Sequence, residues 1–298
     1  MKTNKVYREI KRKIPSIFIR KKYDLFEYNT FRIHSVADIF IKVKEFGELL
    51  KLVDYLVEKN IKYIVLGKGS NVLLCNCSNK LFVVFDKKYD KIDIDGNMLR
   101  VTSSCLINEV VAKCVTNNLK GMEEAIGIPG TIGGAVYMNA SAGNFEISKL
   151  VDSVVVLENG RIKILKNNDC AFGYRSSIFQ KKSAIILDVF LRLERAENYD
   201  FKSVINDTIL RRKNTQPVCQ NSAGSVFKNI GEIKVAKLID EAGLKGYQIG
   251  GAKVSEKHAN FIVTNNATCE DVLMLINYIK EKIFQLFGVE LETEINII

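Results

Sequence analysis

A glycine-dense segment in the middle of the chain constrains the fold more than any other feature of the sequence. Residues 127–141 read GIPGTIGGAVYMNAS, with four glycines and a proline within eight residues, directly before an apolar run. So many glycines remove side chains from a surface that something else must approach closely. A glycine-rich turn that opens a helix offers free N–H groups and the positive end of the helix dipole, which suits a diphosphate. The alternative is a buried loop that crosses between two lobes.

A second glycine segment points in the same direction. Residues 66–74 read LGKGSNVLL and follow a predicted strand, so that backbone N–H groups can converge on an anion. The spacing matches neither GxGxxG nor GxxxxGK[ST], which argues against a Rossmann or a Walker phosphate loop. Alone, this segment could be an ordinary turn after a strand. Two such segments in one chain favour the binding of a phosphate-containing ligand.

Changes in hydrophobic pattern divide the chain into parts, because 298 residues can fill more than one hydrophobic core. Apolar runs at 39–43, 61–66 and 81–85 around an amphipathic helix at 46–60 predict a small α/β lobe. The next part is rich in strands, and helices return after residue 200. Further strands are predicted at 151–157, 162–165, 184–193 and 290–298, and further helices at 107–118, 201–213, 233–242 and 271–287.

Local signals mark the ends of some of these elements. Asn159 and Gly160 lie between two apolar strands, and both residue types adopt positive φ readily, which predicts a tight hairpin. Thr268 followed by Asp271 predicts a capped helix start, and Gly288 predicts the end of the same helix.

The net charge of +10 is compatible with nucleic acid, an anionic membrane surface or small anionic substrates. The lysines are spread over nearly every predicted helix without the basic and aromatic stripe of single-strand binders, so a solvated lysine-rich surface is the simplest interpretation. No apolar run approaches the roughly 20 residues needed to cross a bilayer. We therefore expect a cytoplasmic protein without nucleic-acid or membrane partners.

Seven cysteines without a CxxC pair favour reduced thiols that serve as packing residues, rather than a disulfide framework. Cys75 and Cys77 are close in sequence, but His34 and His258 are the only histidines, so a zinc site lacks ligands. We expect no metal.

Together with four later stretches, the glycine segments resemble the UDP-N-acetylenolpyruvoylglucosamine reductases, a flavoprotein family related to vanillyl-alcohol oxidase. The stretches occur in the family's order and nearly its spacing, from about Asn29 to the end of the chain. They are FGYRSSIF (172–179), SAGSVFKN (222–229), AGLKGYQIGGAKVSEKHANFIVTN (242–265) and LETEINII (291–298).

The resemblance implies an α+β protein with an FAD-binding PCMH-type fold of two α/β lobes followed by an α+β substrate-binding domain. The expected parts are an N-terminal arm with the first FAD-binding lobe (1–88), the second FAD-binding lobe (89–200) and the substrate domain (201–298). The C-terminal strand of the substrate domain is expected to return to the active site. Since FGYRSSIF runs directly into a strand, the chain resembles the shorter class of these reductases, which lacks an inserted lid.

The resemblance further implies an NADPH-dependent, FAD-mediated reduction of the enolpyruvyl group of a UDP-sugar to UDP-N-acetylmuramate, by a monomer, during cell-wall synthesis. By motif match, Arg175 would hold the substrate carboxylate, Ser225 would protonate the enol intermediate, and Glu294 would assist that protonation. From the residues alone, these would be a surface arginine, a turn serine and an exposed strand glutamate.

Other positions match the family's binding residues. Those expected at the FAD are Gly67, Lys68, Gly69, Ser70, Asn71, Val72, Gly127, Pro129, Gly130, Thr131, Gly133, Gly134 and Asn139. Those expected at the UDP-sugar are Tyr174, Arg212, Lys228, Asn229 and His258, and cations among them suit a diphosphate and a carboxylate.

Several residues depart from the family pattern, among them two groups at positions expected near the flavin. His34, Ser35 and Val36 stand where a Gly-Gly-Pro-like run is usual, so the first flavin-facing turn must differ. Ser141, Asn144 and Phe145 stand where glycines are usual, and their side chains either crowd the FAD diphosphate or point away from it.

Two other functions are compatible with parts of the sequence. An FAD-dependent alcohol oxidase or dehydrogenase of the same superfamily could tether its flavin through His34 or a cysteine, but it leaves the Arg175, Ser225 and Glu294 motifs unexplained. A basic nucleic-acid or regulatory binding protein on a degenerate enzyme fold would account for the charge and the departures.

Overall fold

The computed structural model describes residues 3–298, which fall into two units that the chain enters more than once. Unit 1 contains the described residues up to Tyr23, then 38–67 and 79–209. Unit 2 contains 24–37, 68–78 and 210–298. The mixture of helices and sheets confirms the predicted α+β class.

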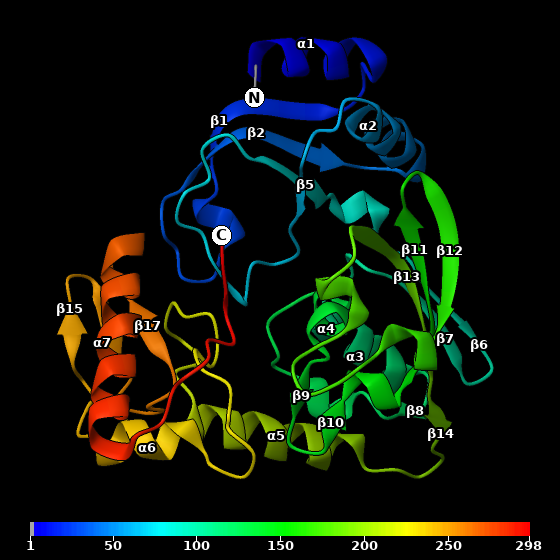
Figure 1. The fold of residues 1–298 in the computed structure, drawn as a ribbon. Helices are drawn as coiled ribbons and strands as arrows, with labels where there is room; N and C mark the ends of the chain where they lie inside the picture. Colours follow the sequence, from blue (N-terminus) through cyan, green and yellow to red (C-terminus); the bar gives the residue numbers. More distant parts are fainter. Residues whose placement is uncertain (1–2) are drawn as a thin grey trace. The chain divides into compact units, whose positions relative to one another are not determined.

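The first sheet of unit 1 has the order β1-β2-β5-β3, formed by β1 (Phe18–Asp24), β2 (Val36–Val43), β5 (Leu81–Phe85) and β3 (Ile64–Val65). Strands β2, β5 and β3 are parallel, and β2 is buried along most of its length, as expected for a parallel strand covered on both faces. Helices α1 (Thr3–Lys13) and α2 (Phe46–Glu58) contribute Ile10, Leu49 and Leu56 to the same core (Figure 1).

The second sheet of unit 1 has the order β12-β11-β13-β7-β6 and is antiparallel. Its strands are β6 (Ile92–Asp95), β7 (Met98–Thr102), β11 (Val151–Glu158), β12 (Arg161–Lys166) and β13 (Ala184–Arg192). Asn159 (φ 51°) and Gly160 (φ 73°) form the β11–β12 turn, which confirms the predicted hairpin. Helices α3 (Ile107–Thr116) and α4 (Ile132–Met138) pack on this sheet in one apolar core.

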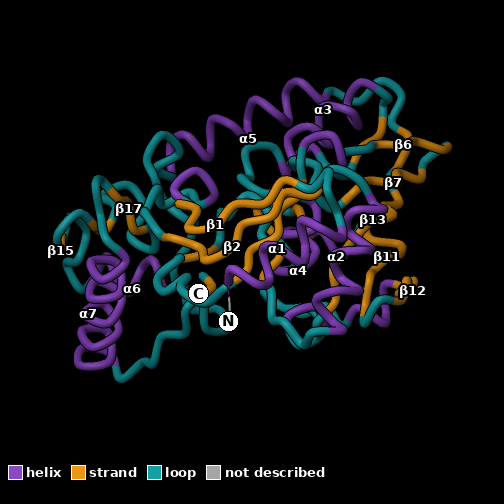
Figure 2. The backbone as a smooth tube through the Cα atoms, turned by 90° about the horizontal axis from the view of Figure 1, so that it is seen from above, coloured by secondary structure: helices purple, strands orange, loops and turns teal. Residues whose placement is uncertain are grey.

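Unit 2 surrounds a core supplied mainly by α6 (Val235–Glu241), α7 (Cys269–Phe287) and the sheet β15-β16-β17 (Figure 2). The strands are β15 (Gln248–Ile249), β16 (Ala252–Val254) and β17 (Ile262–Thr264). Helix α5 (Phe201–Thr215) begins in unit 1 and ends in unit 2. The predicted strand at 290–298 is much shorter, because only β18 (Asn296–Ile297) pairs regularly, in parallel with β4 (Val72–Leu73).

Short elements complete the described chain. Strand β8 (Leu119–Lys120) pairs with β14 (Glu194–Arg195), and β9 (Ser141–Ala142) pairs with β10 (Phe145–Glu146). The 3-10 helices are η1 (Phe26–Tyr28), η2 (Lys87–Tyr89), η3 (Glu123–Ala125), η4 (Ile147–Lys149), η5 (Asn167–Cys170) and η6 (Ile178–Gln180). Between residues 3 and 298, no helix is both long and apolar enough to cross a membrane.

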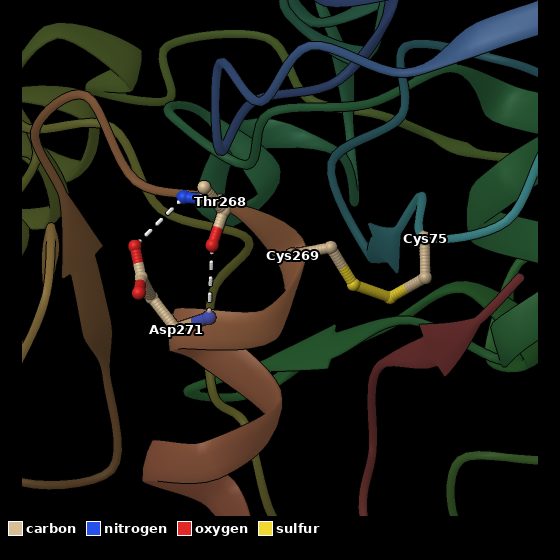
Figure 3. Close-up of a disulfide and its surroundings, with 4 residues drawn as sticks. All are labelled: Cys75, Thr268, Cys269 and Asp271. Carbon is tan, nitrogen blue, oxygen red and sulfur yellow. Dashed lines mark hydrogen bonds between the residues drawn. A yellow bond between two sulfur atoms is a disulfide. The ribbon is translucent and has the colours of Figure 1, made fainter.

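Helix α7 has the N-cap and the C-cap that the sequence predicts, although it begins at Cys269, two residues before the predicted start. The Thr268 hydroxyl accepts a hydrogen bond from the Asp271 N–H, and the Asp271 carboxylate accepts one from the Thr268 N–H (Figure 3). Gly288 ends the helix in the left-handed conformation, with φ at 67°. Capping at both ends satisfies backbone groups that the helix itself leaves without partners.

The expectation of reduced thiols throughout is wrong. Cys75 and Cys269 form a disulfide within unit 2, with their Cα atoms 5.2 Å apart, inside the range that a disulfide spans (Figure 3). The two cysteines are 194 residues apart in sequence, so their spacing gave no sign of the pair. The other five cysteines are free, and all of them except Cys219 are buried, as packing residues are.

Candidate functional site

The two glycine segments meet at Gly67 and Thr131, both in unit 1. A Cβ atom on Gly67 would lie only 2.7 Å from the Thr131 Oγ1, so only glycine permits this approach. Thr131 is the N-cap of α4, and its Oγ1 accepts from the Gly134 N–H at 3.2 Å. The turn after β3 and the turn before α4 therefore form one surface of backbone and hydroxyl groups.

The amide groups at the start of α4 are not free, which corrects the prediction made from the glycine-dense segment. The Ile132 N–H donates to the Cys105 carbonyl at 2.9 Å, and the Gly133 N–H donates to the Ser103 carbonyl at 2.8 Å. These bonds attach α4 to the loop after β7. A diphosphate near this helix must therefore use groups other than these amides.

The remaining residues expected at the cofactor lie in both units. Gly127, Pro129, Gly130 and Asn139 belong to unit 1, whereas Lys68, Gly69, Ser70, Asn71 and Val72 belong to unit 2. Asn139 is buried, and its Nδ2 donates to the Gly173 carbonyl and to the Glu146 carboxylate, both at 2.9 Å. It therefore fixes the start of the turn that contains Arg175.

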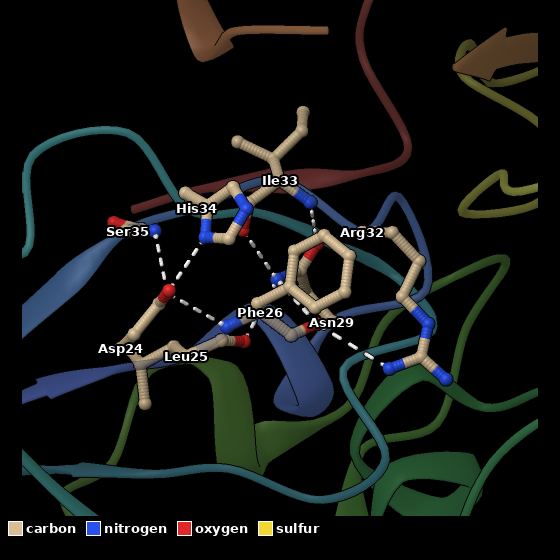
Figure 4. A network of polar contacts seen from close by, with 8 residues as sticks. All are labelled: Asp24, Leu25, Phe26, Asn29, Arg32, Ile33, His34 and Ser35. Atoms are coloured by element: carbon tan, nitrogen blue, oxygen red, sulfur yellow. Dashed lines mark hydrogen bonds and ion pairs between the residues drawn. The ribbon is translucent and has the colours of Figure 1, made fainter. Parts of the chain in front are cut away.

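Asp24, at the end of β1, and the residues 25–35 that follow it belong to unit 2 and meet the second glycine turn. Gly69 has φ at 67°, and a Cβ atom there would lie 2.0 Å from the Tyr28 carbonyl oxygen, which excludes any other residue. The Asp24 carboxylate accepts from His34 Nδ1 at 2.5 Å and from the Phe26 and Ser35 N–H groups (Figure 4). The His34 ring also stacks on Phe26, with ring centroids 4.5 Å apart.

Arg175 occupies a two-residue turn closed by hydrogen bonds between Gly173 and Ser176. Its φ of 53° is unusual for a residue with a side chain, and such outliers concentrate at functional sites. Its guanidinium Nη1 donates to the Ser141 Oγ at 2.6 Å and to the Ser141 carbonyl at 3.2 Å. The hydroxyl of Ser141 thus orients Arg175.

The two other departures from the glycine pattern have contacts of their own. Phe145 is buried in the core of unit 1. The Asn144 backbone and side-chain amides both donate to the Glu124 carboxylate at 3.0 Å. Phe145 is thus buried, whereas Asn144 is exposed and bonded to Glu124.

Ser225 and Glu294 lie on neighbouring extended segments of unit 2. The Glu294 N–H donates to the Val226 carbonyl at 2.7 Å, and the Lys228 N–H donates to the Glu292 carbonyl at 2.9 Å. The segment 225–228 thereby runs antiparallel to 292–294, with Phe227 opposite Thr293. The segments that contain two of the three residues predicted to carry the chemistry are therefore adjacent, although they are separated by most of the substrate domain in sequence. Arg175 belongs to unit 1, so the convergence of all three stays a prediction.

Asn71 connects the second glycine turn to the same C-terminal segment. Its Nδ2 donates to the Glu294 carbonyl at 3.2 Å, and its own carbonyl accepts from the Asn296 N–H at 3.0 Å. Beyond it, β4 and β18 pair in parallel. The residues expected at the cofactor and at the proton transfer are thus linked within unit 2.

Arg212 is a buried cation near the end of α5. Only 8% of it is exposed, and Nη1 donates to the Gln216 Oε1 at 3.3 Å, whereas Nε and Nη2 are buried without a hydrogen-bond partner in the described chain. Burial and the neighbouring Arg211 lower the pKa of Arg212. A buried guanidinium with unused hydrogen-bond donors lowers the stability of the folded protein unless it binds an anion.

The other residues expected at the UDP-sugar have varied surroundings. His258 Nδ1 is also buried without a hydrogen-bond partner in the described chain, and burial and Lys245 lower the pKa of His258. The Lys228 ammonium pairs with Glu292 at 2.5 Å, and the Asn229 Oδ1 accepts from the Val235 N–H at 3.1 Å. Tyr174 is exposed beside Arg175.

The residues present fit a flavin dinucleotide in their shape, but the amides at the start of α4 are not available to bind its diphosphate. The joined glycine turns offer a surface without bulky side chains, as a dinucleotide requires. The α4 amides are already used. Among the described residues, no group of three or more metal-ligating side chains occurs.

The sequence did not single out Ser141 as a partner of Arg175 or Asn260 as a partner of the Ser225 segment. The Asn260 side chain forms hydrogen bonds with Phe227, two residues after Ser225. The sequence marks Ser141 only as a departure from the glycine pattern, and Asn260 only as a member of the 242–265 stretch. Spacing cannot indicate either contact, because the partners are 34 and 33 residues away.

Two family profiles match the chain. Residues 37–166 match the profile described as FAD binding domain, and residues 216–298 match the C-terminal domain of UDP-N-acetylenolpyruvoylglucosamine reductase. Similar proteins named UDP-N-acetylenolpyruvoylglucosamine reductase include one from Caldanaerobacter subterraneus subsp. tengcongensis, 40% identical over 91% of this chain and 90% of its own length. Another, from Alkaliphilus oremlandii, is 35% identical over 99% of this chain and 98% of its own.

A solved structure has the same fold. The crystal structure of UDP-N-acetylenolpyruvylglucosamine reductase from Thermus caldophilus aligns with a TM-score of 0.81 and 28% identity, covering 94% of this chain and 98% of that one. This match confirms the predicted fold class. The profile match, the relatives and the solved structure agree with the glycine turns and the paired segments of Ser225 and Glu294. The chain therefore belongs to the UDP-N-acetylenolpyruvoylglucosamine reductase family of oxidoreductases.

Proposed function

We propose that this protein reduces the enolpyruvyl group of UDP-N-acetyl-3-O-(1-carboxyvinyl)glucosamine to give UDP-N-acetylmuramate for peptidoglycan synthesis, with NADPH as the reductant. The observation that carries the proposal is the pairing of the Ser225 and Glu294 segments, since the Glu294 N–H donates to the Val226 carbonyl at 2.7 Å. Protonation of an enol requires an acid within hydrogen-bond reach of it, and the pairing brings the segments of a hydroxyl and a carboxyl together. The names of the relatives support the same reaction.

The substrate carboxylate is assigned to Arg175. A vinyl ether conjugated to a carboxylate accepts hydride poorly, because negative charge builds on a group that is already anionic. A permanently charged guanidinium stabilises that charge, and the Ser141 hydroxyl, 2.6 Å from Nη1, holds it in one orientation. Arg212 is assigned to an anionic group of the UDP-sugar, because its buried Nε and Nη2 have donors to offer.

Ser225 is assigned as the proton donor and Glu294 as the carboxyl that assists it. A serine hydroxyl is a weak acid, so its proton is transferred only with help from a neighbouring group. Tyr174, Lys228, Asn229 and His258 complete the proposed sugar site.

FAD, when bound, would accept a hydride from NADPH and deliver it to the enolpyruvyl double bond. Gly67, Thr131 and the other residues of the glycine turns would hold the FAD. Asn139 would support this site indirectly, because its side chain binds the carbonyl of Gly173 in the turn of Arg175. The proposal also includes three parts of the chain with boundaries after residues 88 and 200, a monomeric state and a cytoplasmic location.

The experiment is a visible spectrum of the purified protein reconstituted with FAD. We expect a yellow protein that NADPH bleaches and that regains its colour anaerobically only after the enolpyruvyl sugar is added. A protein that stays colourless after reconstitution, or that the sugar does not reoxidise, contradicts the proposal.

A substitution at Ser225 separates the two half-reactions. We expect Ser225→Ala to leave bleaching by NADPH unchanged and to slow reoxidation by the sugar about 10²- to 10⁴-fold, as loss of a general acid does. Stopped-flow absorbance measures both rates. Equal slowing of both half-reactions would remove Ser225 from this role.

A further inference from the structure

A single buried side chain holds the segment that carries Ser225. Asn260 is 4% exposed, and its amide pairs with both main-chain groups of Phe227. Its Oδ1 accepts from the Phe227 N–H at 2.9 Å, and its Nδ2 donates to the Phe227 carbonyl at 2.8 Å. The Asn260 carbonyl also accepts from the Val226 N–H at 2.8 Å. Only a carboxamide side chain offers a donor and an acceptor side by side in this way.

The opposite edge of the segment faces the chain that carries Glu294. There the Val226 carbonyl accepts from the Glu294 N–H, and the Lys228 N–H donates to the Glu292 carbonyl. The Val226 carbonyl and the Lys228 N–H thus bond to one neighbour, whereas the Val226 N–H and both main-chain groups of Phe227 bond to Asn260 on the other side. The Asn260 amide replaces the ladder bonds that a regular strand would provide on its side.

We propose that Asn260 is a positioning residue for reduction of the sugar, because by fixing the main chain of Phe227 it sets where Ser225 lies relative to Glu294. This inference rests on the proposed function. Asn260 acts through the backbone and has no direct role in binding the flavin or the substrate. A shift of about 1 Å in a reacting group can cost about 10²-fold in rate, so the effect is large enough to measure.

The first test is Asn260→Asp, which keeps the shape of the side chain and an acceptor for the Phe227 N–H but cannot donate to the Phe227 carbonyl when ionised. We expect faster hydrogen exchange at the Phe227 amide, with or without flavin. We also expect reoxidation by the sugar to slow about 10- to 100-fold, with bleaching by NADPH unchanged per bound flavin. Asn260→Ser, which adds no charge, should show the same selectivity and replaces the first variant if that one does not fold.

A matched control is Asn167→Asp in unit 1. The Asn167 Nδ2 donates to the Ser148 and Val151 carbonyls at 2.7 Å, so this variant also loses amide–carbonyl bonds, but far along the chain from Ser225. We expect both half-reactions of this control to match the parent protein.

The decisive test places Asn260→Asp in the Ser225→Ala background. If Asn260 acts through Ser225, the second substitution adds no further slowing, because residues that act as a unit are not additive. Full additional slowing in that background, equal slowing of both half-reactions, or unchanged exchange at Phe227 would overturn the inference while leaving the proposed function intact. A parent protein that binds FAD but is not reoxidised by the sugar would instead remove both.

Discussion

At the scale of single residues, Arg212 shows what the sequence could and could not predict. Motif matching assigned it to the substrate, but the residue alone looked like an ordinary cation in the last turn of a helix, where basic residues are favoured. Its burial depends on how α5 is covered in the folded chain, and so does the lack of partners for two of its nitrogen atoms among residues 3–298. A local pattern does not contain that information.

The buried guanidinium of Arg212 should stabilise the complex with the UDP-sugar and destabilise the ligand-free protein. We expect Arg212→Met to raise the melting temperature of the ligand-free protein, since it removes about 1 kcal/mol or more of uncompensated charge burial. The same substitution should weaken binding of the enolpyruvyl sugar about 30-fold or more. Calorimetric melting and titration measure the two effects.

The exposed neighbour Lys213 provides the control for that experiment. Lys213→Met removes a charge of the same sign from the same helix, so we expect little change in either measurement. A lower melting temperature in Arg212→Met would show that the guanidinium is satisfied in the free protein.

At the scale of elements, the sequence predicted those whose signals are local. The Asn159-Gly160 hairpin and the capped start of α7 are both present, because each depends on residues a few positions apart. The sequence did not predict helix α1 or strand β1. In α1 only Val6 and Ile10 are buried, and the many basic residues around them make this apolar spacing hard to recognise. The predicted final strand was too long, because pairing with β4, and not β-propensity, limits β18 to two residues.

The capping box of α7 makes stability depend on pH. Hydrogen bonds from the Thr268 and Gly251 N–H groups hold the pKa of Asp271 below its usual value. A carboxyl whose pKa is lower in the folded state stabilises that state above its unfolded pKa of about 3.9, and the contribution disappears as the pH falls through the folded pKa. Asp271→Asn should therefore cost about 1 kcal/mol near neutral pH and almost nothing well below pH 3.

Urea unfolding at several pH values measures this difference. Glu270→Gln is the matched control, because Glu270 is an exposed carboxylate in the same first turn and its loss tests the helix dipole alone. The same loss of stability in both variants would show that the dipole, rather than the capping bonds, accounts for the effect.

At the scale of the whole molecule, unit 2 is assembled from three stretches of chain whose association the sequence pattern does not indicate. The short stretches 24–37 and 68–78 join it through tertiary contacts, including the hydrogen bond from Thr264 Oγ1 to the Phe31 carbonyl and the Cys75–Cys269 disulfide. Hydrophobic patterns along the chain describe each stretch but not its partners. Family resemblance supplied the fold class for this reason, whereas cysteine spacing led to the wrong expectation.

The disulfide joins the end of β4 to the start of α7 and closes a loop of 194 residues, so it should stabilise the folded chain by restricting the unfolded one. We expect reduction by dithiothreitol to lower the free energy of unfolding by about 2 to 4 kcal/mol, measured by urea unfolding. The Cys75→Ala, Cys269→Ala double variant should have about the same free energy of unfolding as the reduced parent protein, and dithiothreitol should not change it. Cys219→Ser, which removes the exposed free thiol, should keep the full response. Identical unfolding midpoints for the oxidised and reduced parent protein would show that this bond does not stabilise the fold.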